Sequence, residues 1–231
     1  MMRVKIYDTY RIGSDLELTP EQILQLINRF QSPITTPATT LGGRGAVARQ
    51  SIAGIGAVVV KQYLRGGIIR HMTKNKYLKC GKTRGLKEYE LLQTVRNLGI
   101  NAPEPLAWAD RGKRVYSAWL VTRQIYPSRS LMQLSLENEN LARQMMKSTA
   151  EQIKKLIQNK ILHVDCHPGN VIVDAKGRVF LLDFDKGRIY RGDERQLQAR
   201  YFARWKRAVV KHKLPDLLID AMRYELKENQ D

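Results

Sequence analysis

The sequence predicts an α+β protein of two lobes, the first rich in β-strands and the second mainly helical. Two observations support this prediction. Strand-like runs dominate before the segment RQIYPSRS at residues 123–130, and apolar residues recur at helical spacing after it. The chain has 231 residues, enough for two small lobes with cores of their own. We therefore expect an N-lobe at residues 1–125 and a C-lobe at residues 126–231.

The composition is that of a folded, strongly basic protein. Hydrophobic residues make up 43% of the chain and charged residues 27%, which is ordinary for a globular domain. Two cysteines are too few for a Cys-rich zinc cluster and fit a reducing, cytoplasmic setting. We find no signal peptide and no apolar run of the ~18 residues that span a membrane. The net charge of +18 predicts attraction to nucleic acid, anionic lipid or phosphorylated sugars.

In the first lobe the sequence predicts three kinds of element. The stretches AVARQS and AVVVKQY read as strands, and the second contains a run of β-branched residues. A helix is expected from about Leu86 to Leu98. The stretch WADRGKRVYSAWLVTRQI resembles a β-hairpin that turns at Asp110-Arg-Gly.

The second lobe begins with a helix and continues through a polar loop. The helical spacing is carried by Leu141, Met145, Ile153, Leu156 and Ile157. The loop HVDCHPGN at residues 163–170 follows, and then VIV, the turn DAKG and the apolar strand VFLLDF. Helices are expected from there to the C-terminus.

Three oxygen-bearing side chains converge at this loop. Asp165 and Asn170 stand five positions apart, and a hairpin formed by VIV and VFLLD brings Asp183 back beside them. Such ligands suit a hard cation such as Mg²⁺ that carries nucleotide phosphates. The order H-x-D-x-x-x-x-N followed by D-F-x-x-G matches the protein-kinase pattern. Asp165 is then predicted to accept the acceptor's proton, and Asn170 and Asp183 to hold the metal.

The other polar residues of the loop receive secondary roles. We expect His163 to brace the loop through hydrogen bonds, and His167 to face the phosphate as a cation or donor. Cys166 is a bystander in this interpretation. In DFDKG, Asp185 stands where the kinase pattern has glycine, which leaves the familiar activation-loop switching without support.

The kinase pattern also requires a phosphate-covering glycine loop and a lysine on a strand. The stretch TTLGGRGAV offers Gly42, Gly43 and Gly45, followed by Val47, where backbone N–H groups can approach phosphate. Lys61 ends the run AVVVK, so strand alternation can direct its ammonium group towards the phosphates.

A glutamate on the following helix should pair with that lysine, and two candidates exist. On a helical projection Glu88 lies within the arc of Leu92, Val95 and their apolar neighbours, whereas Glu90 points nearly opposite. An acid on a buried face needs a partner to offset its desolvation. Glu88 is therefore the predicted partner of Lys61.

Taken together, these segments resemble the lipopolysaccharide core kinase family, and most closely the Kdo (3-deoxy-D-manno-octulosonic acid) kinases of Gram-negative bacteria. The likeness extends over roughly residues 35 to 210. It rests on GGRGAV, VVKQYLRGG, KYLKCGKTRGLKEYELL, the run Gly-Ile-Asn-Ala-Pro-Glu-Pro at 99–105, HVDCHPGN and LLDFDKGR.

The resemblance implies a protein-kinase-like two-lobed fold with the glycine loop, Lys61 and Glu88 in the N-lobe and the catalytic loop, Asp183 and the terminal helices in the C-lobe. It implies ATP with Mg²⁺ or Mn²⁺, and phosphorylation of a Kdo hydroxyl of the lipopolysaccharide inner core. The acceptor would be a Kdo-containing lipid A precursor or another anionic glycolipid. The protein would be cytoplasmic and peripheral on the inner membrane's cytoplasmic face, with an anionic membrane surface rather than nucleic acid as its partner.

Two basic segments bear on the acceptor. Residues 62–87 contain Arg65, Arg70, Lys74 and Arg84 among their cations and no acid. They are able to bind the carboxylates of Kdo and the phosphates of lipid A, or to form a solvated basic loop. In QLQARYFARWKRAVVKHK a basic stripe runs beside an apolar row, which favours a helix that packs its apolar row inward and turns its stripe to water or lipid. The stripe comprises Arg200, Arg204, Arg207 and Lys211, and the row Leu197, Tyr201, Trp205 and Ala208.

Two other functions remain open from the sequence. The loop is shared with atypical protein kinases of the RIO type and with small-molecule kinases of the aminoglycoside-phosphotransferase type. A basic module that binds nucleic acid or lipid and keeps relic kinase residues would explain the charge, but not the co-occurrence of the catalytic set.

Overall fold

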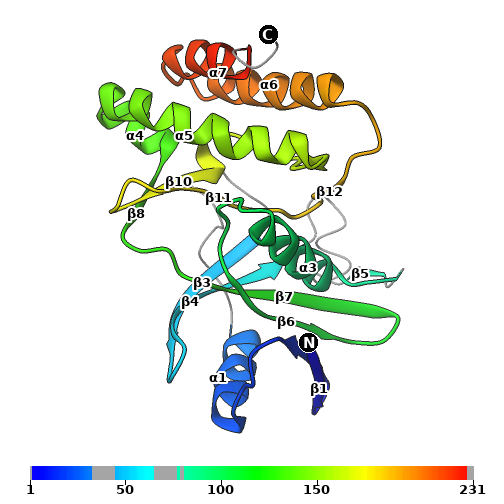
Figure 1. Ribbon diagram of the computed structural model, residues 1–231. Helices are drawn as coiled ribbons and strands as arrows, with labels where there is room; N and C mark the ends of the chain where they lie inside the picture. Colours follow the sequence, from blue (N-terminus) through cyan, green and yellow to red (C-terminus); the bar gives the residue numbers. More distant parts are fainter. Residues whose placement is uncertain (1, 33–44, 65–76, 79–80, 228–231) are drawn as a thin grey trace. The chain divides into compact units, whose positions relative to one another are not determined.

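The computed structural model describes residues 2–32, 45–64, 77–78 and 81–227 (Figure 1). It shows a protein of mixed helix and sheet, which confirms the predicted α+β composition. The chain forms two compact units, which we call the first unit (Met1–Gln93 with Glu104–Gln124) and the second unit (Thr94–Pro103 with Ile125–Asp231).

The first unit is built on an antiparallel sheet. Among the described residues it has seven strands in the order β1-β2-β6-β7-β4-β3, with β5 also paired to β7. The strands are β1 (Arg3–Tyr7), β2 (Tyr10–Ser14), β3 (Gly45–Ile52), β4 (Gly56–Tyr63), β5 (Tyr77–Leu78), β6 (Pro105–Arg111) and β7 (Val115–Arg123). The predicted strands AVARQS and AVVVKQY are confirmed as β3 and β4.

Strand alternation divides this sheet into two faces. Helix α1 (Pro20–Gln31) contributes Ile23, Leu26 and Phe30 to a core cluster that includes Val58 and Val60 of β4. Because successive strand residues point to opposite faces, Lys61 points away from that cluster. It points to helix α3 (Arg84–Asn97), the predicted helix, whose Glu88 it contacts. Figure 1 shows α1 and α3 on opposite sides of the strands.

The predicted hairpin is confirmed as β6 and β7, but only the last residue of the predicted turn Asp110-Arg-Gly lies outside the strands. Asp110 belongs to β6, pairs with Ala118 and is buried. The strand tolerates this carboxylate because Arg11 donates to both of its oxygens and Thr83 adds a hydroxyl donor at 3.0 Å. The chain reverses between β6 and β7 from Gly112 onward, and the φ of 114° at this predicted turn glycine is a backbone conformation that favours glycine.

The second unit is mainly helical, with short strands beside the helices. Helix α5 contacts α4, α6, α7 and β11, so it is central to this unit. The helices are α4 (Leu131–Glu137), α5 (Glu139–Gln158), α6 (Glu194–Lys211) and α7 (Leu217–Lys227), with the 3₁₀ turn η1 (Pro168–Asn170). The strands are β8 (Ser128–Ser130), β9 (Ile161–Leu162), β10 (Val171–Asp174), β11 (Val179–Leu181) and β12 (Arg188–Ile189).

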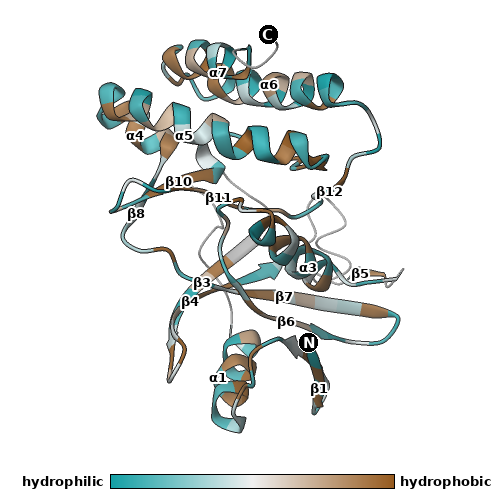
Figure 2. Cartoon of the chain, in the orientation of Figure 1, coloured by the Kyte–Doolittle hydropathy of each residue, from teal (hydrophilic) through white to brown (hydrophobic). Residues whose placement is uncertain are grey.

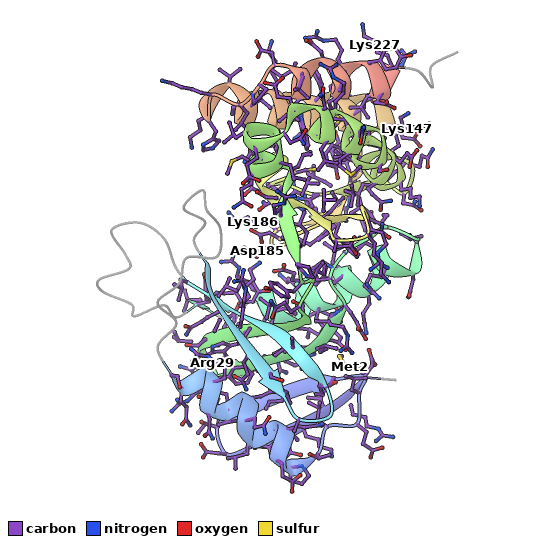
Figure 3. All side chains as sticks on the ribbon, turned by 90° about the vertical axis from the view of Figure 1, so that its left-hand side faces the viewer. Met2, Arg29, Lys147, Asp185, Lys186 and Lys227 are labelled. Carbon is purple, nitrogen blue, oxygen red and sulfur yellow. The ribbon has the colours of Figure 1, made fainter. Side chains whose placement is uncertain are left out.

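The predicted elements of this unit are largely confirmed. Helix α5 contains the predicted apolar row, and β10 and β11 form an antiparallel hairpin across the predicted turn DAKG. The predicted strand VFLLDF is shorter than expected, since β11 ends at Leu181 and the next residues leave the ladder. Figure 2 shows polar residues along the outer faces of these helices, and Lys147 and Lys227 on α5 and α7 project outward in Figure 3.

Helix α6 packs its apolar row inward, as predicted. Leu197, Tyr201, Trp205 and Ala208 are all buried. The indole Nε1 of Trp205 donates to the carbonyl of Leu218 at 2.8 Å, which ties α6 to α7. No helix in the described part of the chain is long and apolar enough to cross a membrane.

Candidate active site

Lys61 and Glu88 form the predicted ion pair in the first unit. The Nζ of Lys61 lies 3.0 Å from Oε1 and 2.9 Å from Oε2 of Glu88, whose side chain is only 4% exposed. The rejected candidate Glu90 instead pairs with Lys82 at the surface, at 2.8 Å. The choice made by helical projection is confirmed, because the carboxylate on the sheet-facing side of α3 meets the ammonium on the α3-facing side of β4.

Tyr63 is a third member of this cluster, which the sequence analysis missed. Its hydroxyl donates to Glu88 Oε2 at 2.6 Å, and the Lys61 ammonium lies 5.1 Å from the centre of its ring. Strand alternation could have predicted this contact, because Tyr63 follows Lys61 by two residues on the same strand and therefore shares its face. Tyr63 helps to satisfy a buried carboxylate that Lys61 alone would leave with spare acceptor capacity.

Arg84, a predicted substrate contact, lies beside the same cluster at the start of α3. Its guanidinium is 5.2 Å from the ring centre of Tyr63 and 4.9 Å from that of Tyr77, and it donates to the Tyr77 hydroxyl at 2.6 Å. The structure therefore connects Arg84 to Glu88 through Tyr63.

The other predicted residues of the first unit lie at the start of β3 or outside the described residues. Gly45 opens β3, and Val47 is paired with Lys61 across the β3–β4 ladder, so their side chains share a face. Gly42 and Gly43 of the glycine loop lie outside the described residues. So do the predicted substrate contacts Arg65, Arg70 and Lys74.

Asp165 lies in the second unit, between β9 and η1, with 47% of its side chain exposed. Arg204 of α6 holds one of its oxygens: Nε is 3.0 Å from Oδ1, and Nη2 donates to the same oxygen. The prediction that Arg204 faces water or lipid as part of the basic stripe is wrong, because its guanidinium contacts Asp165. Arg204 stands next to the buried Trp205 at the edge of the packed face, from where its long side chain reaches the loop.

His163 braces the loop, as predicted. It is buried, and both ring nitrogens are engaged: Nδ1 accepts from the Asp165 N–H at 3.2 Å, and Nε2 lies 2.8 Å from the carbonyl of Leu182. A donor is required at Nε2, because a carbonyl only accepts. The backbone N–H of His163 donates to the Tyr201 hydroxyl at 2.8 Å, which fixes the start of the loop to α6.

His167 is a neutral residue beside the acid. Its Nδ1 accepts from the Gly169 N–H at 3.1 Å, which leaves the ring proton on Nε2, 3.8 Å from Asp165 Oδ2. Burial lowers the pKa of His167 to about 4, and the nearby Asp165 only partly offsets this effect. The lowered pKa and the accepting Nδ1 both favour the neutral donor over the cation.

Cys166 fits the bystander role expected of it. The residue is a free, buried cysteine. Burial raises the pKa of its thiol to about 12, so the nucleophilic thiolate is not populated at neutral pH. Cys80 lies outside the described residues.

Asn170 has an unsatisfied oxygen at the centre of the loop. Its Nδ2 donates to the Asp165 carbonyl at 2.9 Å, which fixes the amide, whereas its buried Oδ1 has no hydrogen-bond partner among the residues described. A buried acceptor left unpaired costs about 1–3 kcal/mol. The Leu182 N–H donates to the Asn170 carbonyl at 2.8 Å, which brings the backbone before Asp183 beside it.

These residues fit a hard cation. Asn170 Oδ1 has lone pairs that no described residue uses, and Asp183, half-buried and at φ 62°, supplies a carboxylate from the adjoining segment. No three His, Cys, Asp or Glu side chains gather into a metal cluster in the part of the chain that the structure describes. A cation held here would draw its other ligands from phosphate or water, as Mg²⁺ commonly does.

The segment after Asp183 forms a tight turn anchored in the core. Phe184 is buried, and its ring centre lies 4.5 Å from that of His163. The Gly187 N–H donates to the Phe184 carbonyl at 2.8 Å, and Lys186 takes a φ of 67°. Asp185 and Lys186, at the bend, are labelled in Figure 3. The turn fixes the backbone after Asp183, and the hydrogen bond from the Leu182 N–H to the Asn170 carbonyl fixes the backbone before it.

Comparison with known proteins gives concordant matches. The model of the lipopolysaccharide kinase (Kdo/WaaP) family matches residues 35–222. A protein of Vibrio parahaemolyticus is 32% identical over 132 residues, 56% of this chain and 55% of the relative, and one of Vibrio vulnificus is 28% identical over 184 residues, 78% and 74%. A Photobacterium profundum relative is 30% identical over 157 residues, 67% and 65%. Each is named 3-deoxy-D-manno-octulosonic acid kinase, and the match to the first spans little more than half of its length.

Proposed function

The chain belongs to the lipopolysaccharide kinase (Kdo/WaaP) family, and from this premise we propose that it transfers a phosphoryl group from ATP to a hydroxyl of Kdo in the lipopolysaccharide inner core. The observation that carries the proposal is the fixed Asn170 amide. Its nitrogen is tied to the backbone of Asp165, and its buried oxygen is left for a ligand. Relatives named as Kdo kinases support the choice of sugar.

Asp165 is the proposed general base. Arg204 occupies Oδ1 and fixes the orientation of the carboxylate, so Oδ2 is the oxygen that accepts the proton of the attacking hydroxyl. His167 presents its Nε2–H on the Oδ2 side. We assign it the role of a neutral donor that orients the incoming hydroxyl or a phosphate oxygen.

Asn170 and Asp183 are the proposed ligands of Mg²⁺ or Mn²⁺. When bound, the cation neutralises the charge on the transferring phosphoryl group. The chain's contribution is to hold the two ligands rigidly. Asn170 is fixed through its Nδ2 and Asp183 through the turn that follows it.

Lys61 is the proposed contact to the nucleotide phosphates. Glu88 and Tyr63 hold its ammonium in place, which reduces the reorganisation needed when phosphate binds. The glycine loop, with Gly42, Gly43, Gly45 and Val47, is proposed to cover the same phosphates. We assign the whole chain a protein-kinase-like two-lobed fold with an N-lobe at 1–125 and a C-lobe at 126–231.

The proposed acceptor is a Kdo-containing lipid A precursor, met at the cytoplasmic face of the inner membrane. Arg65, Arg70, Lys74 and Arg84 remain proposed contacts to its anionic groups. The net charge of +18 supports an anionic membrane surface as a partner. Exposed Lys206, Lys211 and Val210 on α6 line a shallow depression of mixed basic and apolar character.

Transfer to glycolipid tests this function directly. Purified protein is incubated with Mg²⁺, γ-labelled ATP and a Kdo-lipid A precursor, and the labelled product is examined by mass spectrometry. We expect one added phosphate on the Kdo ring. Label found on protein, with none on glycolipid, would instead support an atypical protein kinase.

Asn170→Ala is expected to weaken metal binding. Removal of Oδ1 should raise the Mg²⁺ concentration that gives half-maximal transfer by at least about tenfold, and Asn170→Asp, which keeps an oxygen, should recover part of the loss. The measurement is a Mg²⁺ titration of the initial rate at saturating ATP. Asn140→Ala, at an exposed position of α5, is the matched control and should behave as wild type. An unchanged Mg²⁺ dependence in Asn170→Ala would remove Asn170 from the metal site.

A further inference from the structure

A cavity of about 260 Å³ lies in the second unit next to the candidate base. Its walls are the residues just before Asp165, Arg188 of strand β12 and one face of α6. Nine residues line the cavity, and none of them is acidic. Four are arginines: Arg188, Arg200, Arg204 and Arg207. Because its charged lining residues are all cationic, the cavity favours an anionic ligand.

The fold brings these four arginines together from two elements. Arg200, Arg204 and Arg207 are four and then three residues apart on α6, so they share one face of the helix. Arg188 comes from β12, where it is paired with Leu162, another lining residue. Only the helical stripe could be predicted from the sequence. The position of Arg188 beside it depends on the β9–β12 pairing, which is a tertiary contact.

The four guanidinium groups differ in the contacts that they already make within the protein. Arg204 is committed to Asp165, and Arg200 lies 5.5 Å from the ring centre of Tyr190. Arg188 and Arg207 are exposed and have no ion-pair partner among the residues that the structure describes. These two are therefore available to an anion, and guanidinium groups bind carboxylate and phosphate in bidentate geometry.

The cavity is connected to the chemistry through Arg204, which lines it and also touches Asp165 Oδ1. A volume of 260 Å³ is below the ~300–1,000 Å³ of pockets for drug-sized ligands. It suits one charged part of a larger acceptor. An anion held there would lie beside the carboxylate that deprotonates the reacting hydroxyl.

We propose that Arg188 and Arg207 form the acceptor's anion-binding subsite and hold a carboxylate or phosphate of the glycolipid next to Asp165. This subsite rests on the proposed kinase function. It differs from the predicted contacts in residues 62–87, and it explains why α6 turns arginines both to Asp165 and to the cavity.

Anion binding is tested on wild type and on Arg188→Met/Arg207→Met. The matched control is Arg195→Met, an exposed arginine of α6 outside the cavity. Ligand-observed NMR titrations use free Kdo as the carboxylate probe and a phosphorylated glucosamine disaccharide as the phosphate probe. We expect the double variant to bind at least one probe about tenfold or more weakly, since charged hydrogen bonds are lost. ATP affinity should stay within twofold of wild type, and the control should match wild type.

Steady-state kinetics of the same variants test whether the subsite contributes to binding of the acceptor during catalysis. The acceptor KM of the double variant should rise at least about tenfold, while the KM for ATP stays within twofold. Three results would overturn the subsite: neither probe binds wild type, both bind the double variant as tightly as wild type, or ATP binding weakens in parallel. If wild type transfers no phosphate to glycolipid but the double variant still loses anion binding, the subsite stands and the proposed kinase function fails.

Discussion

Replacing Asp165 with asparagine is expected to lower kcat about 10²–10⁴-fold, the usual contribution of a general base. Asparagine keeps the shape of the side chain and can still accept a hydrogen bond from Arg204 through its oxygen, but it cannot take up the hydroxyl's proton. Binding of Mg-ATP should change little, because Asp165 is not assigned to the nucleotide or the metal. Initial rates of transfer and calorimetric titration with Mg-ATP measure the two quantities separately.

The control for this experiment is Asp220→Asn, an exposed carboxylate on α7 in the same unit. It should retain wild-type rates. Arg204→Lys adds a second comparison, because it keeps the charge but loses the forked geometry that fixes Oδ1. We expect an intermediate loss of kcat from it. Wild-type turnover in Asp165→Asn would exclude Asp165 as the base.

Replacing Lys61 with methionine is expected to affect both catalysis and stability. Loss of the ammonium should lower kcat/KM for ATP by about 10²–10³-fold, the scale seen when one preorganised electrostatic contact is removed. Glu88 would remain as a buried carboxylate with Tyr63 still donating to it. The free energy of unfolding should therefore fall by about 3 kcal/mol, the lower end for breaking a buried ion pair. Urea unfolding and ATP-dependent initial rates provide the measurements.

The double variant Lys61→Met/Glu88→Gln separates these two effects. A neutral glutamine removes the uncompensated charge, so most of the lost stability should return while transfer remains low. Glu90→Gln, at the surface pair with Lys82, is the matched control and should leave both quantities near wild type. A Lys61→Met protein with normal kcat/KM for ATP would exclude the proposed phosphate contact.

Much of the candidate site could be predicted from the sequence because its members lie close together along the chain. Asp165, Asn170 and His163 belong to one loop, and their spacing is a local property of that segment. Glu88 was separated from Glu90 by helical periodicity alone, and Lys61 was placed by strand alternation. Asp110 was wrongly assigned to the turn, because the two donors that stabilise its carboxylate within β6 come from distant segments, Arg11 and Thr83.

The sequence by itself determined the α+β class, the strands around Lys61, the helix of Glu88, the candidate residues of the loop and the resemblance to lipopolysaccharide core kinases. Tertiary structure alone decided which charges meet. It directed Arg204 to Asp165 across 39 residues, left Asn170 Oδ1 without a hydrogen-bond partner among the described residues, and gathered Arg188 with Arg207 around one cavity. The physical reason is that periodicity fixes the face of an element on which a side chain lies. The angle and distance at which two elements pack decide what that side chain reaches.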